Sequence, residues 1–193
     1  MRSVFSALVL ALALLLCQAC AGFGQAEETL PVQTRIEGVV PQEPVLSNST
    51  VPASPPVKLS IPSVGLDKPV LDERACDRLN PESLTDVYWL TCRSMPASDA
   101  PGPVRFLGHG LADGTGAFNP LMDIELGATI TVTTRTGVLN YRVTAIRTYQ
   151  KGSEIQRDPD MNRKVPGTAT LVTCYVDSNG ATNANFVVFA SLV

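Results

Sequence analysis

Short β-type segments separated by turn residues constrain the folded part of this chain most strongly. Between residues 58 and 193, segments rich in Val, Ile, Thr, Tyr and Phe alternate with Gly, Pro, Asp and Asn. We predict strands at residues 58–61, 86–90, 104–107, 128–134, 139–149, 168–173 and 185–192. Helical spacing of apolar residues predicts short helices only at 81–84 and 118–124. The pattern therefore indicates a mainly β domain, folded as a small barrel or roll.

The first 26 residues are typical of an export signal rather than of a fold. Arg2 precedes an apolar run over residues 4–16, and small residues suited to cleavage follow. Three outcomes stay open: cleavage after Ala21 or Ala26, lipid attachment at Cys20, or retention as a membrane anchor. The last is open because about 20 apolar residues cross a bilayer of about 30 Å. All three predict an exported protein.

The next segment, residues 27–57, differs sharply in composition. Six prolines are spread among Gln, Ser, Thr, Glu and Val, without a sustained apolar period. Such a segment predicts an extended, semi-rigid linker. The alternative is that residues 34–40 add an edge strand to the folded domain, which we expect to span residues 58–193.

Charge and aromatic content argue against nucleic-acid binding. The chain has 15 basic and 18 acidic residues, a formal net charge of −3, so it lacks the basic field that phosphate groups require. Aromatic residues make up 6% of the chain, with the single tryptophan Trp89, so no base-stacking surface is indicated.

Three cysteines follow the export signal, namely Cys76, Cys92 and Cys174. An oxidising compartment favours one disulfide, and Cys76 with Cys92 is the economical pair because it closes a loop of about 15 residues, worth about 3 kcal/mol. Cys174 is then left as a free thiol. Such a thiol is an inert buried side chain, a site of intermolecular pairing or a nucleophile.

The surroundings of Cys174 and His109 favour the nucleophile. Cys174 ends a predicted strand, and His109, the only histidine, follows another strand between Gly108 and Gly110. Glycine allows another backbone or a substrate to approach closely. An imidazolium stabilises a neighbouring thiolate and protonates a leaving amine, so the two residues form a candidate catalytic pair. The alternative for His109 is an ordinary solvated loop histidine.

At this point the sequence resembles the sortases, cysteine transpeptidases on the surface of Gram-positive bacteria. The resemblance rests on residues 59–70, Leu107-Gly-His109, residues 116–121, residues 170–174 and residues 186–189, in that order. His109 and Cys174 are 65 residues apart in the sequence. The short layout is most similar to the class E and F members of Actinobacteria.

The resemblance implies an eight-stranded β-barrel with one or two short helices, in which Cys174 and His109 face each other across a groove. Cys174 would cleave an LPxTG-like sorting signal through an acyl-enzyme, and His109 would protonate the departing amine. The implied partners are surface proteins that carry sorting signals, and an amine of a peptidoglycan precursor or a pilin resolves the thioester. No metal, nucleotide or organic cofactor is implied, and we expect a monomer at the extracellular face of the membrane or in the cell wall.

One departure from the sortase pattern concerns an arginine on the last strand that stabilises the oxyanion. Asn183 stands where this arginine is expected, and no arginine follows Arg163. Asn183 can still donate through its amide, but it lacks the charge and the guanidinium fork. Arg142 or Arg147 offers a substitute, although strand alternation allows only one of them to face the groove.

This departure supports an alternative, a catalytically impaired sortase-like module that binds peptides. An L,D-transpeptidase is a weaker alternative, because Val172 and Thr173, not histidine, precede Cys174. Acidic pairs elsewhere are interpreted as solvated loop charges rather than a calcium site; they are Asp123 with Glu125 and Asp158 with Asp160.

Overall fold

The computed structural model describes residues 35–45, 50–76, 80–152 and 154–193. These residues belong to one compact unit, Val32–Val193. The predicted export signal, with its cleavage sites and Cys20, lies outside the described residues. Within the described ranges, no helix is long and apolar enough to cross a bilayer.

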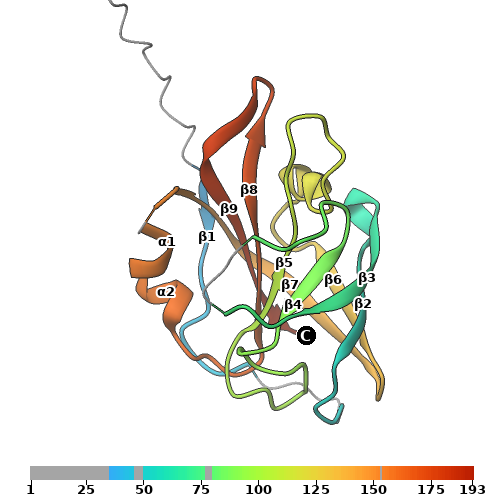
Figure 1. Cartoon of the computed structure of the whole chain (residues 1–193). Helices are drawn as coiled ribbons and strands as arrows, with labels where there is room; N and C mark the ends of the chain where they lie inside the picture. Colours follow the sequence, from blue (N-terminus) through green and yellow to red (C-terminus); the bar gives the residue numbers. More distant parts are fainter. Residues whose placement is uncertain (1–34, 46–49, 77–79, 153) are drawn as a thin grey trace, which may run out of the picture. The chain divides into compact units, whose positions relative to one another are not determined.

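Eight strands form a closed β-barrel, which confirms the predicted fold class (Figure 1). They run in the order β7-β6-β2-β3-β4-β5-β8-β9, and pairing between β9 and β7 closes the ring. The strands are β2 (Pro56–Ile61), β3 (Leu66–Glu73), β4 (Val87–Leu90), β5 (Val104–Leu107), β6 (Thr129–Thr134), β7 (Val138–Gln150), β8 (Thr168–Asp177) and β9 (Gly180–Leu192). All neighbours are antiparallel except β3 with β4 and β5 with β8.

The helices differ from those expected. The segment 118–124 forms a 3-10 helix, η2 (Asn119–Asp123), whereas residues 81–84 are not helical. The short helices α1 (Glu154–Arg157) and α2 (Pro159–Asn162) come between β7 and β8 in the chain and are drawn beside β1 (Figure 1). Each has only four residues, which is too short to show a helical period in the sequence.

The described part of the predicted linker packs on the barrel instead of extending away from it. β1 (Ile36–Gly38) pairs antiparallel with β7, which is the edge-strand alternative. Val40 is buried, and the amide of Val39 bonds the carbonyl of Thr144 at 2.9 Å. Gly38 has a φ of 71°, a left-handed conformation that costs glycine little. The boundary expected at residue 58 is therefore too late for the folded unit.

Strand alternation divides the apolar residues between two clusters. On β9, Phe186 and Val188 join the cluster inside the barrel, while Val187 and Phe189 join a second cluster on the outer face. The outer cluster also holds Ile155 of α1 and Met161 of α2. The helices between β7 and β8 therefore cover part of the outer face.

Candidate active site

His109 and Cys174 leave the barrel at the ends of two adjacent parallel strands. β5 and β8 pair up to Leu107 and Val172, and the amide of Gly108 extends the ladder to the carbonyl of Val172 at 3.3 Å. His109 and Cys174 each follow this last pair by two residues, so both lie on the outer face. The structure thus places the two candidate residues at the same end of one strand pair.

Two glycines permit the close approach of these strand ends. A Cβ built on Gly110 would overlap the carbonyl oxygen of Cys174, and one on Gly108 would lie 2.7 Å from the Phe118 ring. Gly108 and Gly110 are not among the glycines with a positive φ. The reason for glycine at both positions is therefore the close contact and not the backbone conformation. The backbone on either side of His109 is therefore packed directly against β8 and the loop that carries Phe118.

The His109 ring is oriented by a backbone carbonyl. His109 is half-buried, and its Nε2 lies 2.8 Å from the carbonyl oxygen of Pro81. A carbonyl only accepts hydrogen bonds, so Nε2 must carry the hydrogen. In the neutral ring, Nδ1 is then the nitrogen able to accept a proton. This orienting carbonyl, in the connection between β3 and β4, has no signal in the sequence.

The loop after His109 is held by η2. Asn119 bonds both backbone groups of Leu111: its Oδ1 accepts from the amide at 3.0 Å, and its Nδ2 donates to the carbonyl at 2.8 Å. The carbonyl of His109 accepts from the amide of Phe118 at 2.8 Å. Residues 116–121, one of the segments on which the resemblance to sortases rests, therefore fix the backbone around His109.

On the other side of Cys174, the structure brings Asn185 opposite it on β9. Cys174 pairs with Asn185, and both side chains are half-buried. Asn183 is exposed, and its carbonyl accepts from the amide of Lys151 at 2.9 Å. The expectation of Asn183 rests on aligning residues 186–189 with the last sortase strand, whereas the observed register, which is irregular just after Cys174, places Asn185 opposite the cysteine.

Of the two arginines of β7, one is exposed and the other is held by acidic side chains. Arg142 is exposed, whereas Nη1 of Arg147 bonds Asp160 at 2.8 Å and Asp158 at 3.4 Å. Asp158 also caps α2, since its Oδ1 accepts from the amide of Asp160 at 2.7 Å. The interpretation of Asp158 and Asp160 as solvated loop charges is therefore wrong, because they neutralise Arg147.

Electrostatics of this ion pair lower the pKa of Asp160. Burial by itself would raise the pKa of Asp160, but the hydrogen bonds from Gln42 and Arg147 and the nearby positive charges outweigh it. Asp123 and Glu125, the other acidic pair, are exposed. Among the described residues, no group of three His, Cys, Asp or Glu side chains could hold a metal ion.

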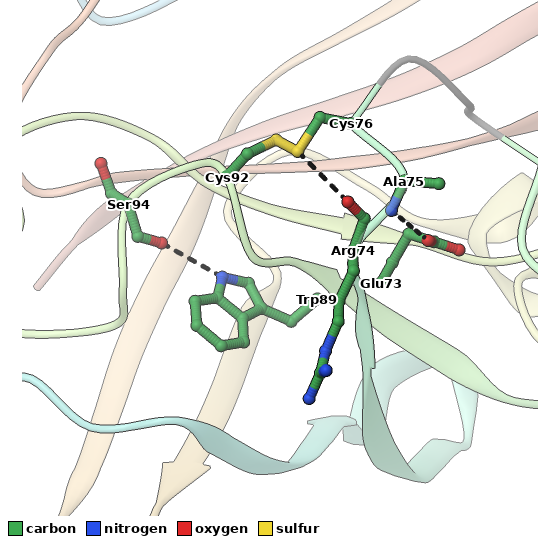
Figure 2. Close-up of a disulfide and its surroundings, with 7 residues drawn as sticks. All are labelled: Glu73, Arg74, Ala75, Cys76, Trp89, Cys92 and Ser94. Carbon is green, nitrogen blue, oxygen red and sulfur yellow. Dashed lines mark hydrogen bonds between the residues drawn. A yellow bond between two sulfur atoms is a disulfide. The ribbon is translucent and has the colours of Figure 1, made fainter.

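A disulfide joins Cys76 to Cys92 across the ends of β3 and β4 (Figure 2). Their Cα atoms are 6.0 Å apart, and Cys174 is the free cysteine of the described residues. Trp89 packs nearby and donates from Nε1 to the carbonyl of Ser94 at 3.1 Å. The disulfide therefore ties the connection that carries Pro81 to the end of β4.

The sequence and the fold were both compared with those of known proteins. The sortase domain family matches residues 59–193. No curated protein sequence matches the chain significantly. Among solved structures, sortase A from Listeria monocytogenes is similar with a TM-score of 0.53 and 22% identity, covering 74% of this chain and 88% of that one.

Two further solved structures are similar. Sortase C-1 from Actinomyces oris has a TM-score of 0.54 and 25% identity, covering 70% of this chain and 72% of that one. Sortase C1 from Streptococcus suis has a TM-score of 0.56 and 19% identity, covering 73% and 74%. The family match runs from within β2 to the end of β9, and it includes β5, β8 and β9, which carry or flank the candidate pair. The chain therefore belongs to the sortase family.

Proposed function

We propose that this protein is a cell-surface cysteine transpeptidase that cleaves an LPxTG-like sorting signal and transfers it to an amine. One observation supports the proposal most strongly: within a sortase domain, the only histidine and the free cysteine of the described residues follow the last pair of two adjacent parallel strands. The proposed partners are surface proteins with sorting signals, and an amine of a peptidoglycan precursor or a pilin.

The chemistry proceeds in two transfers. Cys174 Sγ, as a thiolate, attacks the scissile carbonyl carbon; the C–N bond breaks, and the leaving amine takes a proton from His109. The product is a thioester on Cys174. The incoming amine then attacks this carbonyl, the C–S bond breaks, and the amine returns its proton to His109 as the thiolate leaves.

We further propose that Asn185 serves as the third group of the site. It pairs with Cys174 across the strands, which supports a role in which its side-chain amide donates to the oxygen of the tetrahedral intermediate. Asn183, predicted from the sequence for this role, lies two residues away and is exposed. A neutral amide gives weaker charge stabilisation than an arginine.

Peptide cleavage and transfer by the full chain tests this function. A fluorogenic LPxTG peptide is incubated with and without an amine acceptor, and the products are identified by mass spectrometry. We expect cleavage with transfer to the amine, and none in Cys174→Ala or His109→Ala. Cleavage that persists in Cys174→Ala would contradict the proposal.

A second candidate function is a peptide-binding module without turnover. The observation that favours it is asparagine at position 183, where the resemblance predicts arginine, and again at position 185, opposite Cys174. This module would bind the sorting peptide tightly without modification of Cys174. Binding measured by fluorescence anisotropy, combined with intact-mass analysis of Cys174, separates the two functions.

The predicted location is part of the proposal. Export through residues 1–26 would place the domain at the outer face of the membrane or in the wall, in keeping with class E and F sortases. Membrane and culture fractions, followed by N-terminal peptide mapping, distinguish cleavage, lipidation at Cys20 and an uncleaved anchor. A chain found only inside the cell would contradict the proposed location.

A further inference from the structure

Arg35 lies at the start of the arm formed by residues 35–40, which includes β1 and precedes the residues 59–193 that the sortase family matches. Its carbonyl accepts from the amide of Thr148 on β7 at 2.9 Å, and its own amide donates to Thr148 Oγ1 at 2.9 Å. Thr148 in turn pairs with Phe186 on β9, whose ring lies inside the barrel. The register of the arm therefore brings Arg35 to the inner face of the sheet, near Phe186.

The first contact of the Arg35 side chain is with η2, the helix that holds the loop of His109. Nη1 donates to the carbonyl of Met122 at 3.3 Å, and Nη2 donates to the carbonyl of Ile124 at 3.0 Å. The last carbonyls of a helix lack partners within it, so a guanidinium that binds two of them stabilises this end. At the other end of η2, Asn119 and the amide before it hold the backbone around His109. η2 therefore connects Arg35 with the histidine.

The second contact is with two aromatic rings next to the cysteine. Arg35 Cζ lies 5.7 Å from the centroid of the Phe186 ring, a cation–π contact. The Phe186 ring stacks on that of Tyr175, with the two centroids 5.9 Å apart. Tyr175 follows Cys174 on β8, and Phe186 follows Asn185 on β9. Arg35 thus packs against the stack formed by the residues that come directly after the paired Cys174 and Asn185.

A third contact holds the guanidinium in this orientation. Arg35 Nε donates to Glu37 Oε1 at 2.7 Å, and Nη2 donates to Glu37 Oε2 at 3.3 Å. The side chain of Arg35 is 24% exposed, so most of it is enclosed by these partners. A planar guanidinium donates several hydrogen bonds within its plane and packs its face on an aromatic ring, which the ammonium of lysine does not do. The combination of contacts therefore requires arginine.

We propose that Arg35 is a positioning residue of the active site: by joining η2 to the stack of Tyr175 and Phe186, it holds His109 in place relative to Cys174. The inference rests on the proposed function for the reaction that it assists. Among the described residues, no hydrogen bond joins Arg35 to His109 or Cys174, so it acts through other residues. Its loss should slow the chemical step and leave substrate binding nearly unchanged, because a small displacement of reacting groups slows a reaction steeply.

Steady-state cleavage of the fluorogenic sorting peptide by the full chain tests this role. We expect Arg35→Met to lower kcat by about tenfold or more, with KM nearly unchanged. Arg35→Lys keeps the positive charge but lacks the fork that binds both carbonyls of η2, so it should recover only part of kcat. An unchanged kcat in Arg35→Met would overturn the proposal.

Arg147→Met is the matched control, because Arg147 makes the same kinds of contact on the outer face. It pairs with Asp158 and Asp160, and its Cζ lies 5.7 Å from the centroid of the Phe189 ring. Urea denaturation should show a loss of stability in both Arg35→Met and Arg147→Met, whereas only Arg35→Met should lose kcat. Equal losses of kcat in the two variants would overturn the proposal, because the effect would then follow stability alone.

Nuclear magnetic resonance of the imidazole ring separates this inference from the proposed function. His109 is the only histidine, so every imidazole signal of the full chain belongs to it. The hydrogen on Nε2, held by the Pro81 carbonyl, should exchange with water faster in Arg35→Met than in the native protein and in Arg147→Met.

The two readouts then lead to different conclusions. If no peptide is turned over but the Nε2 hydrogen exchanges faster only in Arg35→Met, the positioning role stands and the transpeptidase is wrong. If peptides are turned over but Arg35→Met changes neither kcat nor this exchange, the transpeptidase stands and the positioning role is overturned.

Discussion

Gly110 is the residue that most directly limits how closely the two strand ends approach. A Cβ at this position would overlap the carbonyl oxygen of Cys174, and a backbone atom cannot rotate away. We expect Gly110→Ala to lower the free energy of unfolding by about 1–3 kcal/mol and to reduce kcat/KM strongly, since it displaces Cys174 from His109. Urea denaturation and peptide cleavage measure the two effects.

Gly102→Ala is the matched control for this substitution. The nearest atom to a Cβ on Gly102 is Ser94 Oγ at 3.3 Å, the end of a small side chain. We expect near-normal stability and activity. Equal losses in Gly102→Ala and Gly110→Ala would show that close approach at Cys174 has no special role.

The two asparagines of β9 form a second matched pair. Asn185 pairs with Cys174, while Asn183 is exposed beyond it. If Asn185 stabilises the oxyanion, Asn185→Ala should lower kcat by about 10²–10³-fold, and Asn183→Ala should have little effect. Steady-state kinetics with the fluorogenic peptide measure both. The reverse order would restore the sequence-based choice of Asn183.

At the scale of elements, one ion pair fastens α2 to the barrel. Arg147 on β7 contacts Asp158 and Asp160, with side chains 23%, 18% and 17% exposed. We expect Arg147→Met to lower the free energy of unfolding by about 2 kcal/mol, because it removes the nearest positive charge from two partly buried carboxylates, of which Asp160 keeps only a longer contact with Arg163 and the hydrogen bond from Gln42. Chemical denaturation measures the change. Arg142→Met, exposed on the same strand, should change little.

The same ion pair predicts a pH dependence of stability. The folded pKa of Asp160 lies below its ordinary value, so its contribution is fully present above the unfolded pKa of about 4. It is lost as the pH falls through the folded pKa. Denaturation at several pH values should therefore show that Asp160→Asn is less stable than the native protein at pH 6, with the difference shrinking below pH 4. A difference that is independent of pH would contradict this assignment.

The elements that could be predicted from the sequence are those with a continuous β pattern, such as β5, whose predicted and observed bounds agree. β3 was missed because Pro69 and charged residues interrupt its apolar pattern. β1 has only three residues, and its place on β7 depends on a tertiary contact at Gly38. In the site, His109 could be found as the only histidine and Cys174 as the cysteine left over once Cys76 and Cys92 pair. Pro81 contributes only a backbone carbonyl, and Asn185 is recognised only from its pairing with Cys174, so neither could be found from the sequence.

For the whole molecule, the disulfide contributes to stability by reducing the conformational entropy of the unfolded chain. Cys76 and Cys92 are 16 residues apart. Replacing both with alanine should lower the free energy of unfolding by about 3 kcal/mol in the chain-entropy picture. Chemical denaturation of the Cys76→Ala/Cys92→Ala variant measures the loss, with Cys174→Ala as the control. Unchanged stability of the double variant would show that the folded contacts alone hold β3 against β4.

The pairing of Cys174 with His109 is tested most directly by intact-mass analysis of the full chain with a sorting-signal chloromethyl ketone. In this reaction Cys174 Sγ forms a C–S bond and chloride leaves. We predict rapid modification of Cys174 alone in the native protein. In His109→Ala the rate of modification should be lower by a factor of about 10² or more. Modification at the same rate in both proteins would show that the histidine and the cysteine do not act as a pair.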